Sequence, residues 1–246
     1  MRDFDKETTV ADVAVRHPES KPVLEQLGLD YCCRGATTLE RAARESGHTL
    51  AEVRAEIEKA VEAARAKSAA AKDWSAATVS ELAEHIVSAH HVFMKTQLPR
   101  LAGLFDRVIA AHERHGEMLR AVRKEFDGLR EEIEAHLMKE EQILFPYIQQ
   151  LDQYRPGSGP APASHCGTVQ NPIRQMMHEH ENAGAALARM RELTSEYALP
   201  SGACATFEAL YTGLKGIETD LHEHIHLENN ILFPKAIEIE ARVAVE

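Results

Sequence analysis

The chain has 246 residues, of which 44% are hydrophobic and only 5% aromatic, and its formal net charge is −11 at pH 7. This length allows one large domain, or one domain and a smaller one. Ala, Leu, Glu and Arg are abundant, whereas Val/Ile/Thr alternation between Gly-rich turns is hard to find. This composition excludes a typical all-β fold and favours helices, so we expect an all-α protein.

Charge and hydropathy exclude further classes of protein. Lys and Arg are scattered along the chain, which argues against a basic patch for nucleic acid and against a polybasic membrane anchor. The N-terminus has no apolar signal core, and no run of 18 apolar residues occurs. We therefore expect a cytoplasmic protein with neither a nucleic-acid partner nor a membrane partner.

The first part of the sequence predicts several short helices. Two are expected over about 10–15 and 18–27, and a longer, charged helix over about 50–67. Possible capping boxes pair Thr with Glu three positions later, and they are Thr37 with Glu40, Thr49 with Glu52, and Thr78 with Glu81. The third box opens a new section, so we expect a small helical domain over residues 1–72 and a second domain over 73–246.

The sequence of the second domain predicts four long helices. We expect them over about 79–111, 116–150, 172–197 and 203–241, with a kink or break at Pro99. The first and second helices are joined by a short connection, and so are the third and fourth. Short connections make neighbouring helices antiparallel, so the pattern predicts an up-down four-helix bundle.

One stretch of sequence occurs twice, 88 positions apart. His136–Pro146 reads HLMKEEQILFP, and His224–Pro234 reads HIHLENNILFP. In both copies a histidine precedes a glutamate by four positions. Because positions i and i+4 share one face of a helix, each copy can present an imidazole and a carboxylate to the same metal site.

Both His/Glu pairs fall on the apolar stripe of their helices. Identical intervals of four, three, four and three positions separate the members of each stripe. The two stripes are Leu129, Ile133, His136, Glu140 and Ile143, and Ile217, Leu221, His224, Glu228 and Ile231. The third long helix keeps a histidine in this frame, His180, but has Gly184 in place of the carboxylate.

Four histidines, one from each long helix, follow one another at intervals of 45, 44 and 44 residues. With helices and loops of similar length, these side chains can reach one level of the bundle. Two ionised carboxylates at that level are costly to bury unless a cation pairs with them. We therefore expect two metal ions, each with two histidines, bridged by both glutamates. The predicted ligands are His91, His136, Glu140, His180, His224 and Glu228.

The spacing alone leaves the metal open. Imidazole and carboxylate ligands suit iron or manganese, and zinc could also occupy such a site. A single histidine on an apolar stripe is more often an ordinary core residue, but two repeated pairs at equal spacing are not explained in this way. His85, His90 and His112 stay ambiguous, since His112 reaches the site only if the chain bends at Pro99. The remaining histidines are interpreted as surface residues or as supports of the site.

The ligand pattern resembles the hemerythrin-like domain, with the six predicted ligands at its metal positions. Oxygen-carrying hemerythrins have a second histidine on the third helix, four residues from the first. Here Met176 precedes His180 by four positions and Gly184 follows it by four. One ligand fewer implies a more open centre, suited to reactivity rather than to reversible storage of oxygen.

The whole chain resembles the di-iron ScdA/YtfE-like proteins that repair iron–sulfur clusters, which join an N-terminal domain with a Cys-Cys-x-Gly motif to such a bundle. The motif here is Asp30-Tyr31-Cys32-Cys33-Arg34-Gly35, followed by Thr38-Leu39. The resemblance implies two oxo- or hydroxo-bridged iron ions and the repair of clusters after nitric oxide or oxidative damage. It also implies damaged iron–sulfur proteins as clients, with nitric oxide or oxygen as a small ligand.

Cys32 and Cys33 are the predicted catalytic thiols, because a nearby cation such as Arg34 favours the reactive thiolate. Two small buried residues are the alternative reading. Four cysteines are too few for a disulfide scaffold, and adjacent cysteines rarely form an unstrained bridge, so we interpret all four as thiols. Cys166 and Cys204 have no assigned role, and the adjacency of Glu179 to His180 suggests a place on the route of access.

Several functional alternatives remain at this stage. The chain could be an oxygen or nitric oxide sensor or carrier, a labile iron store without turnover, or a structural zinc bundle. Whether it has a nitric oxide reductase-type activity or acts as a repair factor also stays open. So does the oligomeric state, for which a homodimer is one option.

Overall fold

The computed structural model describes residue 4 and residues 7–67, 73–157 and 159–244. Helices account for nearly all regular structure in this part of the chain, and its one β-type pairing is an isolated antiparallel bridge between Thr9 and Thr38. The predicted all-α class is therefore confirmed. No helix among the described residues is both long enough and apolar enough to span a bilayer.

The contacts divide the chain into two compact units. The first is Met1–Ala77 together with Ile225–Pro234, and the second is Thr78–His224 together with Lys235–Glu246. Residue 72, where we expected the first domain to end, lies outside the described residues. The segment 225–234 is covalently continuous with the last long helix, although its contacts group it with the first unit.

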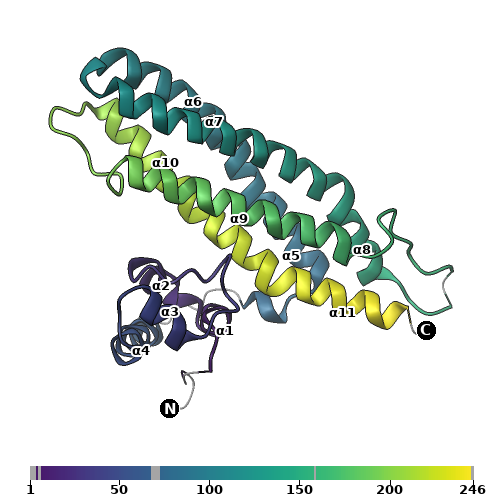
Figure 1. The fold of residues 1–246 in the computed structure, drawn as a ribbon. Coiled ribbons are helices and arrows are strands. Elements are labelled where there is room, and N and C mark those ends of the chain that lie inside the picture. Colours follow the sequence, from purple (N-terminus) through teal and green to yellow (C-terminus); the bar gives the residue numbers. More distant parts are fainter. Residues whose placement is uncertain (1–3, 5–6, 68–72, 158, 245–246) are drawn as a thin grey trace. The chain divides into compact units, whose positions relative to one another are not determined.

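The N-terminal part of the first unit is a set of short helices. They are α1 (Val10–Arg16), the 3₁₀ turn η1 (Pro18–Ser20), α2 (Lys21–Gln26), α3 (Leu39–Glu45) and α4 (Leu50–Lys67) (Figure 1). Apolar side chains from each of the four α-helices are fully buried and form its core; they include Val13, Leu24, Leu39 and Ile57. Burial of such side chains is the main favourable term in forming this small unit.

Side-chain caps begin several of these helices. Thr49 and Glu52 form the expected reciprocal hydrogen bonds before α4. Thr9 and Asp12 form a further capping box before α1. The predicted box at Thr37 is wrong by one residue, because Thr38 caps α3 by accepting from the main-chain N–H of Arg41.

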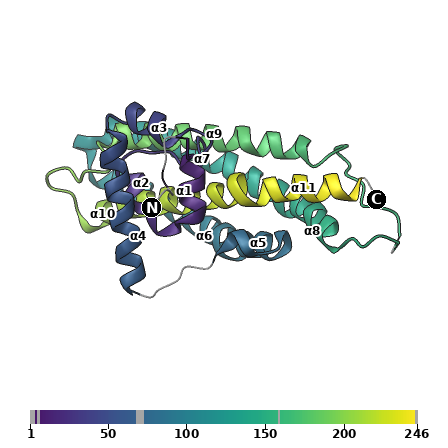
Figure 2. The same cartoon turned by 90° about the horizontal axis from the view of Figure 1, so that it is seen from below.

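The second unit contains the long helices. They are α5 (Val79–His85), α6 (Val92–Ala111), α7 (Gly116–Lys139), α8 (Phe145–Gln153), α9 (Gln170–Leu193), α10 (Ala205–Leu227) and α11 (Phe233–Val243). A capping box of Thr78 and Glu81 begins α5, as predicted. A 3₁₀ turn, η4 (Glu113–His115), joins α6 to α7. Figures 1 and 2 show α6, α7, α9 and α10 running alongside one another as the four-helix bundle.

Three of the four expected helices are interrupted by π-helical turns. These turns are η3 (Ile86–His91), η5 (Glu140–Leu144) and η6 (Glu228–Leu232), and each joins two α-helices without a loop. The predicted break at Pro99 does not occur, because α6 continues through this residue. The ladder of hydrogen bonds changes instead at η3, one turn before α6 begins.

Helices α6 and α10 pack closely at Gly213. An added Cβ at this position would lie 2.3 Å from Cδ2 of Leu101, a side chain that is itself fully buried. One turn later, a Cβ at Gly216 would meet only the ring of Phe93, at 3.9 Å. The two glycines thus differ in the space available for a side chain, although both lie inside α10.

We expect Gly213→Ala to make the protein less stable than Gly216→Ala by about 1–3 kcal/mol, the usual cost of overpacking. Both substitutions gain the same helix propensity relative to glycine, so their difference isolates the contact with Leu101. Urea unfolding followed by circular dichroism measures this difference. Equal stabilities would show that Leu101 yields without cost.

Candidate metal centre

The π turns coincide with the predicted metal ligands. His91 is the last residue of η3, whereas Glu140 and Glu228 are the first residues of η5 and η6. A π turn inserts one residue into a helix and so rotates the side chains that follow it. Such turns are frequent at functional sites, and the sequence pattern gave no sign of them.

The structure brings the six predicted residues together in two overlapping groups. His91 and His224 form one group with Glu140 and Glu228, and His136 and His180 form the other with the same two glutamates. Within each group the candidate ligand atoms lie within 4.8 Å of one another. All six side chains are buried, and both carboxylates are completely so. The site lies in the bundle interior, where water does not screen charge.

The ring distances support this pairing of the histidines. The ring centroids of His91 and His224 lie 5.1 Å apart, and those of His136 and His180 lie 4.9 Å apart. Distances between the pairs are longer, at 6.3 Å for His136 to His224 and 6.5 Å for His180 to His224.

The two oxygens of Glu140 face different histidines. Oε2 lies 3.4 Å from Nε2 of His91 and 3.8 Å from Nε2 of His224, whereas Oε1 lies 3.3 Å from Nε2 of His136. One carboxylate therefore presents an oxygen to each histidine pair. This is the arrangement that a carboxylate bridging two cations requires.

The protonation pattern of the histidines fits a metal as well. Nδ1 of His91 lies 2.8 Å from Oε1 of Glu141, and Nδ1 of His136 lies 2.8 Å from Oε2 of Glu179. Because a carboxylate only accepts hydrogen bonds, each Nδ1 carries a proton, and Nε2 is the nitrogen of each ring that can bind a metal. Nε2 of His136 and Nε2 of His180 lie 3.2 Å apart. Ring nitrogens that converge in this way suit a shared cation.

Two ion pairs extend these contacts towards the surface. Lys95 contacts both oxygens of Glu141, at 2.6 and 2.8 Å, and Lys139 contacts Glu179. Burial tends to raise the pKa of Glu179, but hydrogen bonds from His136, Lys139 and Gln175 outweigh it and lower the pKa to about 2. Burial also tends to raise the pKa of Glu141, but hydrogen bonds from Lys95 and His91 outweigh this effect and lower the pKa. Both carboxylates are therefore ionised at neutral pH and orient their histidines.

These roles go beyond the sequence-based expectations. The oxygens of Glu179 contact His136, Lys139 and Gln175, and its place on the route of access stays a prediction. Glu141 was not singled out, although its place after Glu140 in the repeated stretch is a signal that could have found it.

The three ambiguous histidines lie in different places. His90 is buried, its Nδ1 lies 3.1 Å from Oδ1 of Asp220, and its ring stacks on His224. The ring of His85 packs edge-on against His90. His112 ends α6, and its Nε2 lies 3.1 Å from Sγ of Cys204. His90 thus directly contacts the predicted ligand His224.

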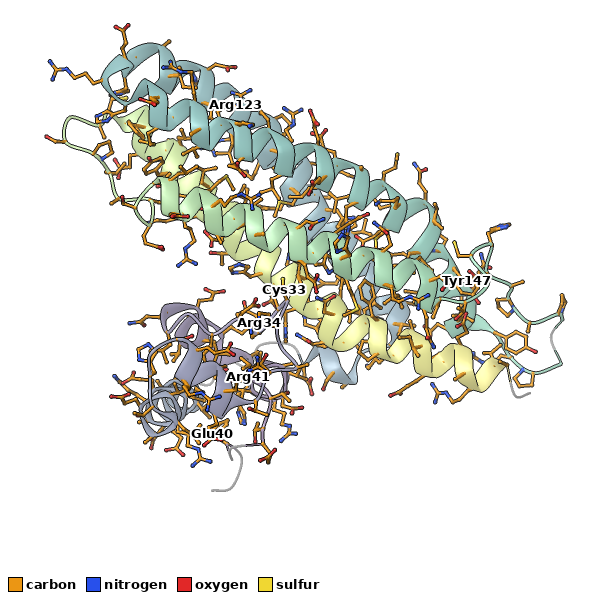
Figure 3. All side chains as sticks on the ribbon, in the orientation of Figure 1. Cys33, Arg34, Glu40, Arg41, Arg123 and Tyr147 are labelled. Atoms are coloured by element: carbon orange, nitrogen blue, oxygen red, sulfur yellow. The ribbon has the colours of Figure 1, made fainter. Side chains whose placement is uncertain are left out.

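The Cys-Cys-x-Gly motif forms a tight loop before α3, and Figure 3 labels Cys33 and Arg34 on it. The main-chain N–H groups of Cys32 and Cys33 both donate to Oδ1 of Asp30. The two sulfur atoms lie 3.7 Å apart, with no disulfide between them. Asp30, Cys32 and Cys33 also form a third group that could hold a metal ion.

Arg34 does not serve the thiols as expected. Its guanidinium donates to Oε2 of Glu45 at 2.8 Å. Cys32 is buried, and its pKa is raised well above the ordinary value by the hydrogen bond with Cys33, by burial and by the charge of Asp30. The expected activation of Cys32 by Arg34 is therefore wrong, and Cys32 is held as a neutral thiol.

The motif requires glycine at position 35, because there is no room for a side chain. An added Cβ at Gly35 would lie 2.6 Å from the carbonyl oxygen of Tyr31 and 2.8 Å from Cβ of Ala11. Within the same unit, the side chains of Asn229 and Asn230 donate to the carbonyl oxygens of Cys32 and Tyr31, at 3.1 and 2.9 Å. These contacts fix the main chain of the motif.

Comparisons with known proteins agree with both parts of this description. Residues 82–236 match the hemerythrin HHE cation binding domain, and residues 6–61 match ScdA_N, a domain of unknown function (DUF542). The fold and the site thus define a hemerythrin-like cation-binding protein with an N-terminal ScdA_N domain.

Relatives cover nearly the whole chain. The iron–sulfur cluster repair protein YtfE of Edwardsiella ictaluri (strain 93-146) is 37% identical over 235 residues, which span 94% of this chain and 97% of the relative. The proteins of the same name from Pectobacterium carotovorum subsp. carotovorum (strain PC1) and Escherichia coli O81 (strain ED1a) are each 34% identical over 232 residues, with the same shares covered. The chain belongs to the YtfE family of iron–sulfur cluster repair proteins.

We expect Glu179→Gln to weaken metal binding by about 10–100-fold, the usual effect of removing a carboxylate that orients a ligand histidine. Iron affinity measured by competition with a chelator checks this. Glu181→Gln is the matched control, because Glu181 lies on the same helix but is 70% exposed. Equal affinities of the two variants would contradict the orienting role of Glu179.

Proposed function

We propose that this protein repairs iron–sulfur clusters damaged by nitrosative or oxidative stress, and that it does so with a di-iron centre. The observation that carries the di-iron assignment is that both glutamates belong to both histidine groups. Two cations that share Glu140 and Glu228 would each have two histidines and two carboxylates as ligands. The proposed ligands are the six residues predicted from the sequence.

The donor set and the names of the relatives together favour iron as the metal. Imidazole and carboxylate ligands suit iron and manganese, and the six residues contribute no thiolate, which zinc and copper(I) sites often use. The matched domain is described as cation-binding, and the relatives that span the chain carry a name in iron–sulfur cluster repair. Bound iron would supply redox chemistry and open positions for nitric oxide or oxygen.

The protein side chains contribute positioning and proton placement. Glu141 and Glu179 keep a proton on Nδ1 of His91 and His136, so that Nε2 is the nitrogen of each that would bind a metal. The buried surroundings exclude water from the carboxylates of Glu140 and Glu228 and strengthen their interaction with a cation. Lys95 and Lys139 balance the charges of the two outer carboxylates.

The thiol pair is proposed to act in repair rather than in holding the di-iron centre. Cys32 and Cys33 are absent from both histidine groups and form their own group with Asp30. Soft thiolates and a carboxylate suit transient binding of iron on its way to a client cluster. This step needs loss of the Cys32 proton, which iron binding itself favours.

Replacement of a shared glutamate should remove the dinuclear centre. We expect Glu140→Leu and Glu228→Leu each to lower iron content from about two ions per chain, because each substitution removes a ligand of both cations. Leucine suits the buried stripe, so circular dichroism should show an intact helical fold. Metal analysis and Mössbauer spectra of the purified proteins measure the outcome.

Glu134→Leu provides the control for these variants. Glu134 lies on the same helix as the ligand His136, but it is exposed and pairs with Arg130. Full dinuclear iron in either ligand variant would rule out the shared-glutamate assignment. Zinc as the sole metal in the wild-type protein would instead favour a structural bundle.

Replacement of both thiols should separate iron binding from repair. We expect Cys32→Ala/Cys33→Ala to retain iron while recovering less activity of a nitric oxide-damaged iron–sulfur enzyme in a reconstituted assay. Recovery equal to that of the wild-type protein would remove the thiols from the mechanism. Nitric oxide added anaerobically to the reduced protein then tests the small-ligand chemistry. Release of nitrous oxide supports turnover, and binding without turnover supports a sensor, a carrier or an iron store.

A further inference from the structure

A second reactive group lies far from the proposed metal centre. Cys204 is exposed and directly precedes α10, which begins at Ala205. His224 follows it by 20 positions on this helix. At 1.5 Å per residue, the thiol lies about 30 Å along the helix from that ligand. The group therefore has no part in binding the metal.

The thiol of Cys204 is paired with an imidazole from another helix. Sγ of Cys204 lies 3.1 Å from Nε2 of His112, the residue that caps the C-terminus of α6. The ring of His112 packs against the buried ring of Phe207, with centroids 5.1 Å apart. The main-chain N–H of His112 also bonds the carbonyl of Val108. The imidazole is thus fixed in place against the sulfur.

Both helix ends favour a charged pair. Cys204 lies at the N-terminus of α10, where main-chain N–H groups stabilise an anion, and His112 lies at the C-terminus of α6, which stabilises a cation. The imidazole of His112 and the N–H groups of Phe207 and Thr206 lower the pKa of the Cys204 thiol to about 7. The thiolate is the form of cysteine that attacks sulfur electrophiles.

An ordinary structural role explains this pair poorly. Exposed Cys204 buries little apolar surface, and His112 is only partly buried. The other exposed cysteine, Cys166, lies in the loop between α8 and α9, and Figure 1 shows that loop at the opposite end of the bundle from the α9–α10 connection. Within the described bundle, a disulfide formed by Cys204 with a small molecule would therefore meet no neighbouring thiol to resolve it.

We propose that Cys204, with His112, is a site of covalent modification by low-molecular-weight disulfides. The thiolate attacks one sulfur of the disulfide, a new S–S bond forms to Cys204, and the original S–S bond breaks. The departing thiolate takes the proton carried by His112. Cys204 is oxidised and the small disulfide is reduced, so no further oxidant is needed.

Oxidised glutathione added to the full-length, iron-loaded protein tests this proposal. We expect one glutathione per chain, placed on Cys204 by peptide mapping and absent from Cys204→Ser. Preferential modification of Cys166, or of Cys32 and Cys33, would overturn it. Iron content measured before and after the reaction shows whether the metal centre is unaffected, as the separation requires.

The rate of alkylation at pH 6 tests the role of His112. With a pKa of about 7, Cys204 should react with iodoacetamide about fivefold faster than an unperturbed thiol, after allowing for the lower intrinsic nucleophilicity of its thiolate. Exposed Cys166 is the internal reference. His112→Gln should reduce this advantage, because only the main-chain N–H groups of Phe207 and Thr206 then lower the pKa of Cys204. An unchanged rate ratio in that variant would remove the imidazole from the site.

Discussion

The burial of two carboxylates inside an apolar bundle is the constraint on which the rest of this structure depends. Glu140 and Glu228 are completely buried, and each has a carboxylate oxygen within 4.8 Å of a ring nitrogen of all four histidines. An ionised carboxylate that is buried without a partner charge is strongly unfavourable, so two ionised carboxylates here call for compensating positive charge. The imidazoles, their outward partners and the π turns can all be understood as parts of a cation site.

The surrounding charges form a layered arrangement. The imidazoles of His91 and His136 hydrogen-bond to Glu141 and Glu179, and these carboxylates are in turn paired with Lys95 and Lys139. Beyond the imidazoles, each negative carboxylate is followed by a positive ammonium group that is more exposed to solvent. This series of contacts fixes both the orientation of a ligand histidine and the ring nitrogen that carries a proton. The metal ligands by themselves would fix neither.

Sequence periodicity predicted the helices well, but it missed their irregular turns. The first long helix was expected over 79–111, and α5, η3 and α6 together span Val79–Ala111. The expected break at Pro99 failed because a proline removes one hydrogen bond without necessarily ending a helix. The π turns at His91, Glu140 and Glu228 are invisible to a pattern of 3.6 residues per turn, because each one adds a residue locally.

The sequence by itself determined the fold class and the six residues that meet in the bundle, because helical periodicity and equal spacing depend only on position along the chain. Tertiary structure alone decided which histidines pair, that Nδ1 of His91 and of His136 bonds Glu141 and Glu179, and that Arg34 binds Glu45 rather than the thiols. It also decided that His112 meets Cys204, 92 positions away. These features depend on contacts between helices, whose rotation and register no single segment specifies.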